Sequence, residues 1–210
     1  RLAHYQHDQK FYDLCDKEGM IVWAEIPYIS EHLPNGRENT ISQMRELVTQ
    51  NYNHPSIVVW GLSNEITMHG ENDPDLIENH KILNDLVHEM DKTRLTTIAN
   101  VTMTSMDSEL CKIPDIISYN HYFGWYGGDV ADNPEWFDKF HRENPDILVV
   151  YLPIEFEIED DGTRNTDKEN QEKMDFLIKN LLDTSGVKYI TVTGSVEERV
   201  QQIENFLKTI

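Results

Sequence analysis

The sequence predicts an α/β fold built from repeated parallel strand–helix units. Apolar, strand-like runs alternate with amphipathic, helix-like segments along most of the chain. The run over residues 56–65 is continuously apolar and then ends in Asn64 and Glu65, which is typical of a strand buried on both faces. Polar side chains also follow the other strand candidates, as they do at the carboxyl edge of a parallel sheet.

The individual elements follow from periodicity and from their terminal residues. A helix is expected over residues 7–18, because its apolar residues share one face and Gly19 follows as a typical C-cap. The same 3.6-residue spacing predicts three further helices, over residues 40–51, 75–90 and 134–143. Strands are expected over residues 20–27, 56–65, 95–101 and 115–122. This alternation fits right-handed crossovers in either a barrel or a flat doubly wound sheet.

Composition narrows the class of protein. The 210 residues are long enough for a substantial core, and the formal net charge of −20 argues against nucleic acid and anionic membranes as partners. The two cysteines, Cys15 and Cys111, fit a reducing compartment. No run has membrane-spanning length and no signal peptide is visible, so a cytoplasmic location is expected. The first residue is not Met, and we expect a piece of a longer protein.

The ends of the expected strands carry side chains suited to sugars. In chain order these are Glu25, Asn64, Glu65, Asn100, Asn120, His121 and Tyr122, followed by Trp125 and Tyr126. Amides and carboxylates bind hydroxyl groups, while aromatic faces stack on the apolar side of a pyranose ring. Trp23 and Trp60 are expected in the core. This rim favours a barrel that binds a small carbohydrate at its carboxyl end.

Four segments carry a family resemblance: 1–5 (RLAHY), 11–16 (FYDLCD), 60–65 (WGLSNE) and 120–126 (NHYFGWY). Together they make residues 1–146 resemble the catalytic barrel of family 2 glycoside hydrolases, with bacterial β-galactosidases nearer than β-glucuronidases. The resemblance implies retaining hydrolysis of a terminal β-galactoside-like bond. It implies the following roles: Glu65 as general acid/base, Asn64 on the sugar 2-hydroxyl, Tyr122 hydrogen-bonded to the nucleophile, and Arg1, His4, Asn120 and Trp125 at the substrate site.

The last third of the chain differs. Residues 148–209 resemble the C-terminal part of P-loop ATPases and kinases related to nicotinamide-riboside kinases, through the segments 160–164 (DDGTR) and 195–199 (SVEER). That resemblance makes Arg164 a lid arginine, although the phosphate-binding Gly-x-x-x-x-Gly-Lys motif is absent. Ser195 is expected to cap the last helix. We therefore expect a chimera of two fragments, 1–146 and 147–210, packed as one continuous α/β domain.

The number of strands predicts an open sheet. Four barrel-type strands form a partial TIM barrel, and two P-loop-type strands, at residues 147–152 and 188–193, extend it. Because six strands do not satisfy the closure of an eight-stranded barrel, the sheet should be open or incompletely closed. Its exposed edges would favour self-association.

A second catalytic carboxylate is not obvious. A retaining mechanism needs a nucleophile about 5–5.5 Å from the acid/base, and the family motif Ser-Glu-Tyr-Gly is missing. Glu155 falls in its place as a possible substitute nucleophile, so activity is expected to be weak or lost. Two alternatives stay open: a non-catalytic chimeric fold with relic sites, and a nucleotide-binding module. No cofactor or metal site is expected, although Glu25 leaves magnesium open and His4 and His7 have a spacing compatible with a ligand pair.

Overall fold

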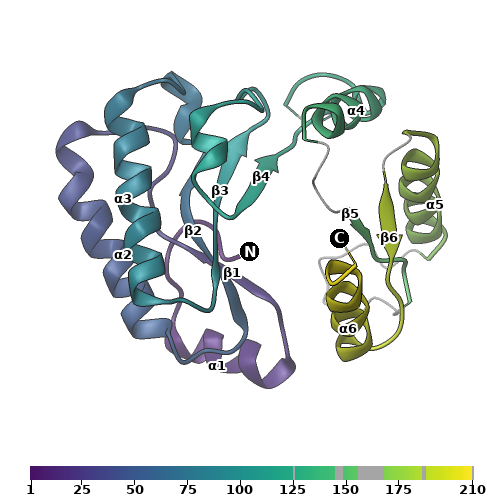
Figure 1. The fold of residues 1–210 in the computed structure, drawn as a ribbon, viewed down its shortest axis with the longest axis horizontal. Helices are drawn as coiled ribbons and strands as arrows, with labels where there is room; N and C mark the ends of the chain where they lie inside the picture. The colour runs from purple at the N-terminus through teal and green to yellow at the C-terminus, as the bar shows by residue number, and fades with distance from the viewer. Residues whose placement is uncertain (125, 145–148, 156–167, 186–187, 210) are drawn as a thin grey trace. The chain divides into compact units, whose positions relative to one another are not determined.

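The computed structural model describes residues 1–124, 126–144, 149–155, 168–185 and 188–209. These fall into two compact units, residues 1–127 and 128–210 (Figure 1). The expected join at residue 146 lies among residues 145–148, outside the described residues, so a domain boundary at that point stays a prediction.

Unit 1 is a repeated β/α structure. Its helices and strands are α1 (Gln9–Glu18), β1 (Val22–Glu25), α2 (Arg37–Asn51), β2 (Ile57–Asn64), α3 (Pro74–Met90), β3 (Leu95–Val101) and β4 (Ile116–Asn120). Short 3-10 turns occur at η1 (Pro34–Gly36), η2 (Ile66–His69) and η3 (Glu109–Lys112). The four strands form one sheet in the order β1-β2-β3-β4, and every neighbouring pair is parallel. The α/β class and the unclosed partial barrel are therefore confirmed.

Unit 2 contains a second sheet. Its elements are η4 (Val130–Asp132), α4 (Asn133–Glu143), β5 (Val149–Tyr151), α5 (Lys168–Ser185), β6 (Tyr189–Thr191) and α6 (Val196–Leu207). Strands β5 and β6 pair in parallel with each other. Ser195 caps α6 as expected: its hydroxyl accepts from the Glu198 N–H, and the Glu198 carboxylate accepts from the Ser195 N–H.

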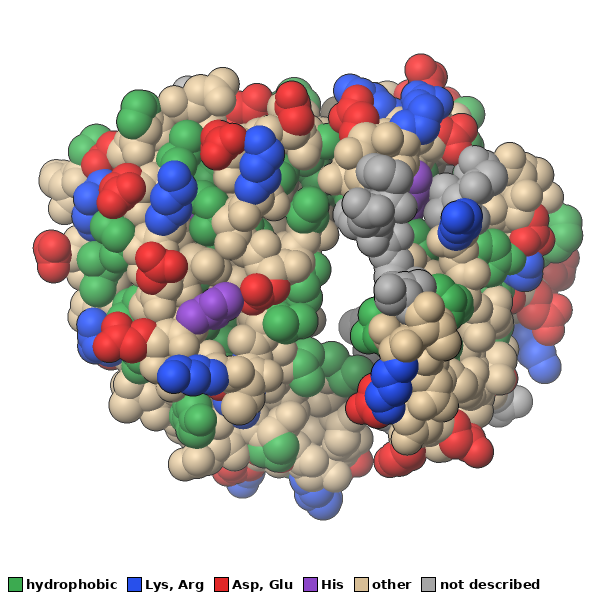
Figure 2. All heavy atoms as spheres, viewed as in Figure 1, with side chains coloured by type: hydrophobic (Ala, Val, Ile, Leu, Met, Phe, Trp, Pro, Cys, Tyr) green, Lys and Arg blue, Asp and Glu red, His purple; other side chains and the backbone are tan. Residues whose placement is uncertain are grey.

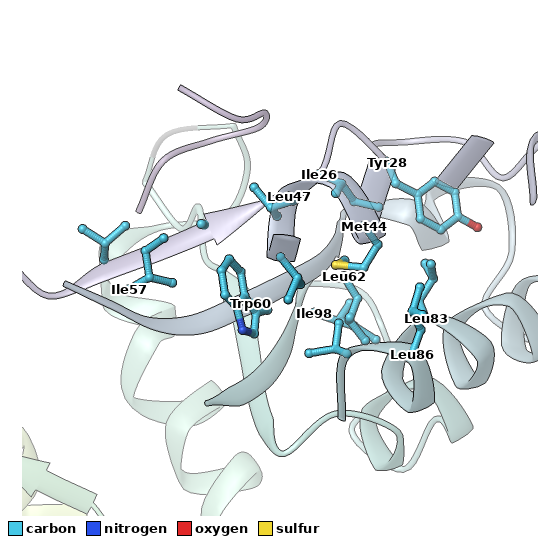
Figure 3. Close-up of a cluster of buried hydrophobic side chains, with 14 of the residues drawn as sticks. Ile26, Tyr28, Met44, Leu47, Ile57, Trp60, Leu62, Leu83, Leu86 and Ile98 are labelled. Atoms are coloured by element: carbon cyan, nitrogen blue, oxygen red, sulfur yellow. The ribbon is translucent and has the colours of Figure 1, made fainter. Parts of the chain in front are cut away.

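The core of unit 1 lies between the sheet and the helices α2 and α3, which cover one of its faces (Figures 1 and 3). Strands contribute Trp60, Leu62 and Ile98, and the helices contribute large apolar side chains such as Met44 and Leu83. These side chains are almost fully removed from water, so their burial supplies the main stabilising free energy. Trp60 is in the core as expected.

Strand β2 is irregular near its carboxyl end. Gly61 pairs with Thr97, and Ser63 pairs with Ile98, so two steps along β2 match one step along β3. This is a β-bulge, which changes the side of the sheet to which the following residues point. The bulge lies directly before Asn64 and Glu65.

The surface is strongly acidic overall, with Asp and Glu side chains interspersed with Lys and Arg on the face seen in Figure 2. Among the residues that the structure describes, no helix is long and apolar enough to span a bilayer.

Candidate active site

Arg1 joins the carboxyl ends of three strands. Its Nε and Nη2 donate to the Glu25 carboxylate at the end of β1, at 2.9 and 3.1 Å. Nη2 also donates to Asn64 Oδ1 at the end of β2, at 2.6 Å, and Nη1 donates to Asn120 Oδ1 at the end of β4, at 2.8 Å. Because strands of a parallel sheet end at one edge, residues far apart in sequence meet here.

Glu65 has a left-handed backbone, with φ 50° and ψ 30°. A non-glycine residue rarely adopts this conformation, and such strain is concentrated at functional positions. Its backbone N–H donates to the carbonyl of Ala99 at 2.8 Å, which ties the turn to β3. The side chain is directed to the rim, where Oε1 accepts from Asn120 Nδ2 at 2.8 Å.

Tyr122 is the second contact of the Glu65 carboxylate. Partial burial raises the pKa of the Tyr122 hydroxyl, and its hydrogen bond to Glu65 raises it further. A phenol that keeps its proton donates to the carboxylate. The resemblance assigned this tyrosine to the nucleophile, whereas the structure places its hydroxyl against Glu65.

Glu25 is the buried charge of the site. Its side chain is 0% exposed and receives the Arg1 guanidinium in bidentate fashion and His4 Nδ1 at 2.6 Å. A buried carboxylate is tolerated only when charged hydrogen bonds replace its water. Arg1 in turn lies 4.4 Å from the ring centre of Trp23, which is therefore part of the rim's support rather than of the central core.

The contacts of Glu65 orient its carboxyl group. An amide N–H can only donate, so Glu65 Oε1 accepts from Asn120. A carboxyl group held in this way can give a proton to a bound group and take one back.

The predicted residues divide into two groups. Arg1, His4, Asn64, Asn120 and Tyr122 all join Glu65 in one connected network. Trp125 and Arg164 lie outside the described residues. Their roles stay predictions.

Glu155 belongs to unit 2 and has partners there. Its Oε2 accepts from the Gly194 N–H at 2.7 Å and from Arg199 Nη2 at 2.5 Å. The Gly194 N–H holds the pKa of this carboxyl below its usual range, and the nearby Arg199 acts in the same direction. Glu155 is thus stabilised as a carboxylate, which a nucleophile requires. Its Oε2, however, is already hydrogen-bonded to Arg199. Its pairing with Glu65 stays a prediction.

Metal ligation at the rim gains no support. His7 Nδ1 contacts the carbonyl of Tyr5 at 2.9 Å, whereas His4 contacts Glu25, so these two histidines, whose spacing left a ligand pair open, have separate partners. Within the described ranges, one group of possible ligand atoms lies within 4.8 Å: Asp13, Asp16 and His54. Both ring nitrogens of His54 already have hydrogen-bond partners.

Sequence reasoning missed how Glu25 works. From the sequence, Glu25 was expected on the rim with magnesium left open, whereas in the structure it is the counter-ion of Arg1 and a hydrogen-bond partner of His4. The available signal was a carboxylate at the end of a buried strand, which needs a cation nearby. It also missed a buried pair on the opposite face of β2, Ser63 and His80.

A parallel β/α sheet that gathers a carboxylate, two amides and an arginine at its carboxyl edge has the arrangement of a β/α-barrel ligand site, with groups that can bind hydroxyls. Residues 1–152 match the family described as "Glycosyl hydrolases family 2, TIM barrel domain". The chain belongs to glycosyl hydrolase family 2.

Several relatives have names that indicate an activity. A β-glucuronidase of Bacteroides fragilis is 38% identical over 161 residues, which are 71% of this chain and 22% of that protein. A β-galactosidase of Thermoanaerobacterium thermosulfurigenes is 29% identical over 58% of this chain and 16% of its own length. The crystal structure of an FMN-binding β-glucuronidase from Facaelibacterium prausnitzii L2-6 is 42% identical with a TM-score of 0.69, covering 91% of this chain and 31% of its own. The chain thus spans less than a third of each.

These comparisons change two expectations. The family match runs past residue 146 to residue 152, and the 91% coverage by the Facaelibacterium structure must include residues beyond it. Nothing in them supports a P-loop resemblance of residues 148–209 or a chimera. Relatives named β-glucuronidase also predominate over β-galactosidase, contrary to the expected order.

Proposed function

We propose that this chain provides the acid/base part of a retaining β-glycosidase site, with Glu65 as the proton donor. The observation that carries the proposal is the network at the end of β2, in which Asn120 holds Glu65 Oε1 and Arg1 holds both Asn64 and Asn120. The network orients the carboxyl group, as directed proton transfer requires.

In the first step, the Glu65 carboxyl group protonates the glycosidic oxygen while the bond to the sugar carbon breaks and a second carboxylate attacks that carbon. In the second step the Glu65 carboxylate removes a proton from water, which displaces the sugar from the second carboxylate. Asn64 binds the sugar 2-hydroxyl. Tyr122 donates a hydrogen bond to the Glu65 carboxylate.

The proposed substrate is a terminal β-glucuronide, because the names of the relatives that are 38% and 42% identical favour it. A β-galactoside is the second candidate, supported by the relative of that name. Glu155 is the proposed substitute nucleophile. Because the Arg199 guanidinium is paired with Glu155 Oε2, the carboxylate should be a poor nucleophile, and we expect hydrolysis by the 210-residue chain to be weak.

The test compares leaving groups. The wild-type chain, Glu65→Gln and the control Glu109→Gln, which removes a surface carboxylate paired with Lys112, are assayed on dinitrophenyl and phenyl β-glucuronides and β-galactosides. A phenolate leaving group needs a proton, whereas a dinitrophenolate does not. Glu65→Gln should therefore lower kcat/KM by about 10²-fold or more on the phenyl substrates and far less on the dinitrophenyl ones. Equal losses on both, or no hydrolysis and no sugar binding by the wild-type chain, would refute the proposal.

A further inference from the structure

Ser63 and His80 form a buried polar pair between β2 and α3. His80 is fully buried, and its Nε2 lies 2.7 Å from Ser63 Oγ, while its Nδ1 lies 2.9 Å from the carbonyl of Leu76. A carbonyl can only accept, so Nδ1 carries the proton and Nε2 accepts from the Ser63 hydroxyl. Burial lowers the pKa of His80 to about 4, so the ring is neutral near pH 7 and this polarity is fixed.

The pair coincides with the bulge in β2. Leu62 packs in the core on the helix side, and a Cβ on Gly61 would meet Trp23 and Glu25 on the opposite side. Strict alternation would return Ser63 to the Gly61 side and direct Asn64 toward the helices. Instead Ser63 reaches α3 and Asn64 reaches the rim, because the bulge inserts one residue between Gly61 and Ser63.

The backbone of Asn64 is hydrogen-bonded to residues 28–30, which follow β1. Its N–H donates to the carbonyl of Tyr28 at 3.0 Å, and its carbonyl accepts from the Ser30 N–H at 3.0 Å. The Tyr28 ring stacks on His80, with ring centres 5.2 Å apart. His80 therefore contacts both the Ser63 side chain and the segment that holds Asn64.

We propose that His80 is a positioning residue: by accepting from Ser63 it holds the bulge of β2 and so turns Asn64 toward the sugar site. This role rests on the proposed function. It differs from ordinary core packing, because loss of the bond should alter Asn64 and Glu65 specifically. Regular alternation would place the Asn64 amide on the helix side, away from Arg1 and Asn120.

The experiment measures the strand end directly, without a substrate. NMR on the 210-residue chain follows the Asn64 side-chain amide and hydrogen exchange of the Glu65 backbone N–H in His80→Leu and Ser63→Ala. The control is Asn84→Leu, which removes another α3–sheet hydrogen bond: the Asn84 Oδ1 accepts from Thr96 Oγ1 at 2.6 Å. Thermal melting of each variant records its general destabilisation.

The two pair variants should shift the Asn64 amide and accelerate Glu65 exchange about tenfold, as expected for one buried hydrogen bond lost. His80→Gln, whose amide oxygen accepts from the Ser63 hydroxyl, should restore both signals. If His80→Leu does not fold, the comparison is made between His80→Gln and Ser63→Ala. Unchanged signals in both pair variants, or equal changes in the control, would overturn the proposal. These NMR signals are measured without a sugar. Absence of hydrolysis by the wild-type chain would therefore refute the proposed function, whereas the NMR signals test the role of His80 separately.

Discussion

Replacing Asp91 by Asn should destabilise the unit that carries the site. The Asp91 side chain is 0% exposed and accepts from Arg94 Nη1 at 2.7 Å, from Trp60 Nε1 at 3.0 Å, and from the N–H and hydroxyl of Thr93 at 2.9 and 2.6 Å. Asparagine would direct an amide N–H toward some of these donors and leave the Arg94 charge uncompensated.

Removing one partner of a buried ion pair costs about 3–5 kcal/mol. The lower end applies here, because Arg94 also donates to backbone carbonyls that the substitution leaves in place. We therefore expect a loss of about 3 kcal/mol in the free energy of unfolding at pH 7, measured by urea titration of tryptophan fluorescence. The control Asp85→Asn, at an exposed position of α3, the helix that precedes Asp91, should stay within about 0.5 kcal/mol of wild type. A loss below about 1 kcal/mol for Asp91→Asn would refute the reasoning.

The same carboxylate predicts a dependence on pH. Burial tends to raise the pKa of Asp91, but the hydrogen bonds from Thr93, Arg94 and Trp60 outweigh it and hold the pKa well below its usual range. The stabilisation is then fully present above the unfolded pKa of about 3.9 and is lost as pH falls toward the lower folded value. The difference between wild type and Asp91→Asn should stay constant from about pH 5 to 8 and shrink below about pH 4.

Three further results are expected. Gly61→Ala should cost about 1–3 kcal/mol in urea unfolding, because the new Cβ would lie 2.5 Å from Glu25 Cβ; Gly36→Ala, whose Cβ finds an ordinary contact, should not, and equal effects would contradict the clash. Asn120→Leu removes the donor to the proposed acid/base carboxylate and should lower kcat/KM about 10–100-fold; an unchanged kcat/KM would count against its role. Ser195→Ala breaks the capping box of α6 and should lower protection of that helix in hydrogen exchange by about 1 kcal/mol, whereas unaltered protection would mean that the cap does not stabilise the helix.

Local pattern was enough for most elements of unit 1. The strand expected over residues 95–101 matches β3, Leu95–Val101, because β-branched residues such as Thr96, Thr97 and Ile98 favour a strand. The helix expected from residue 40 begins at Arg37, because the turn Pro34–Gly36 leads directly into it and the apolar periodicity starts only later. Periodicity records which face is buried, and the ends of an element depend on turns that it does not record.

The sequence was enough to predict the Glu65 carboxylate, but it was not enough to predict the hydrogen bonds that connect the site. Glu65 could be recognised because a buried strand ended in a charge. The bond from Asn120 to Glu65 joins residues 55 apart, and no local signal specifies such a contact. The bulge at Ser63 reverses the alternation on which any assignment of faces depends, so the partner of His80 was not predictable from spacing. Generic strand–helix alternation after residue 147 also fits many α/β families, and the P-loop interpretation depended on that alternation and two short motifs.

The contact between Arg1 and Glu25 has a consequence for substrate choice. An arginine at a sugar site would ordinarily attract the carboxylate that distinguishes glucuronic acid from galactose. Here both edges of the Arg1 guanidinium are occupied, by a buried carboxylate and by two amide oxygens, and its charge is already balanced. Arg1 therefore aligns the strand ends and does not increase the affinity for an anionic sugar. Under the proposed function, selectivity for a glucuronide over a galactoside would require donor groups other than Arg1, and substituting Arg1 should impair both substrates alike.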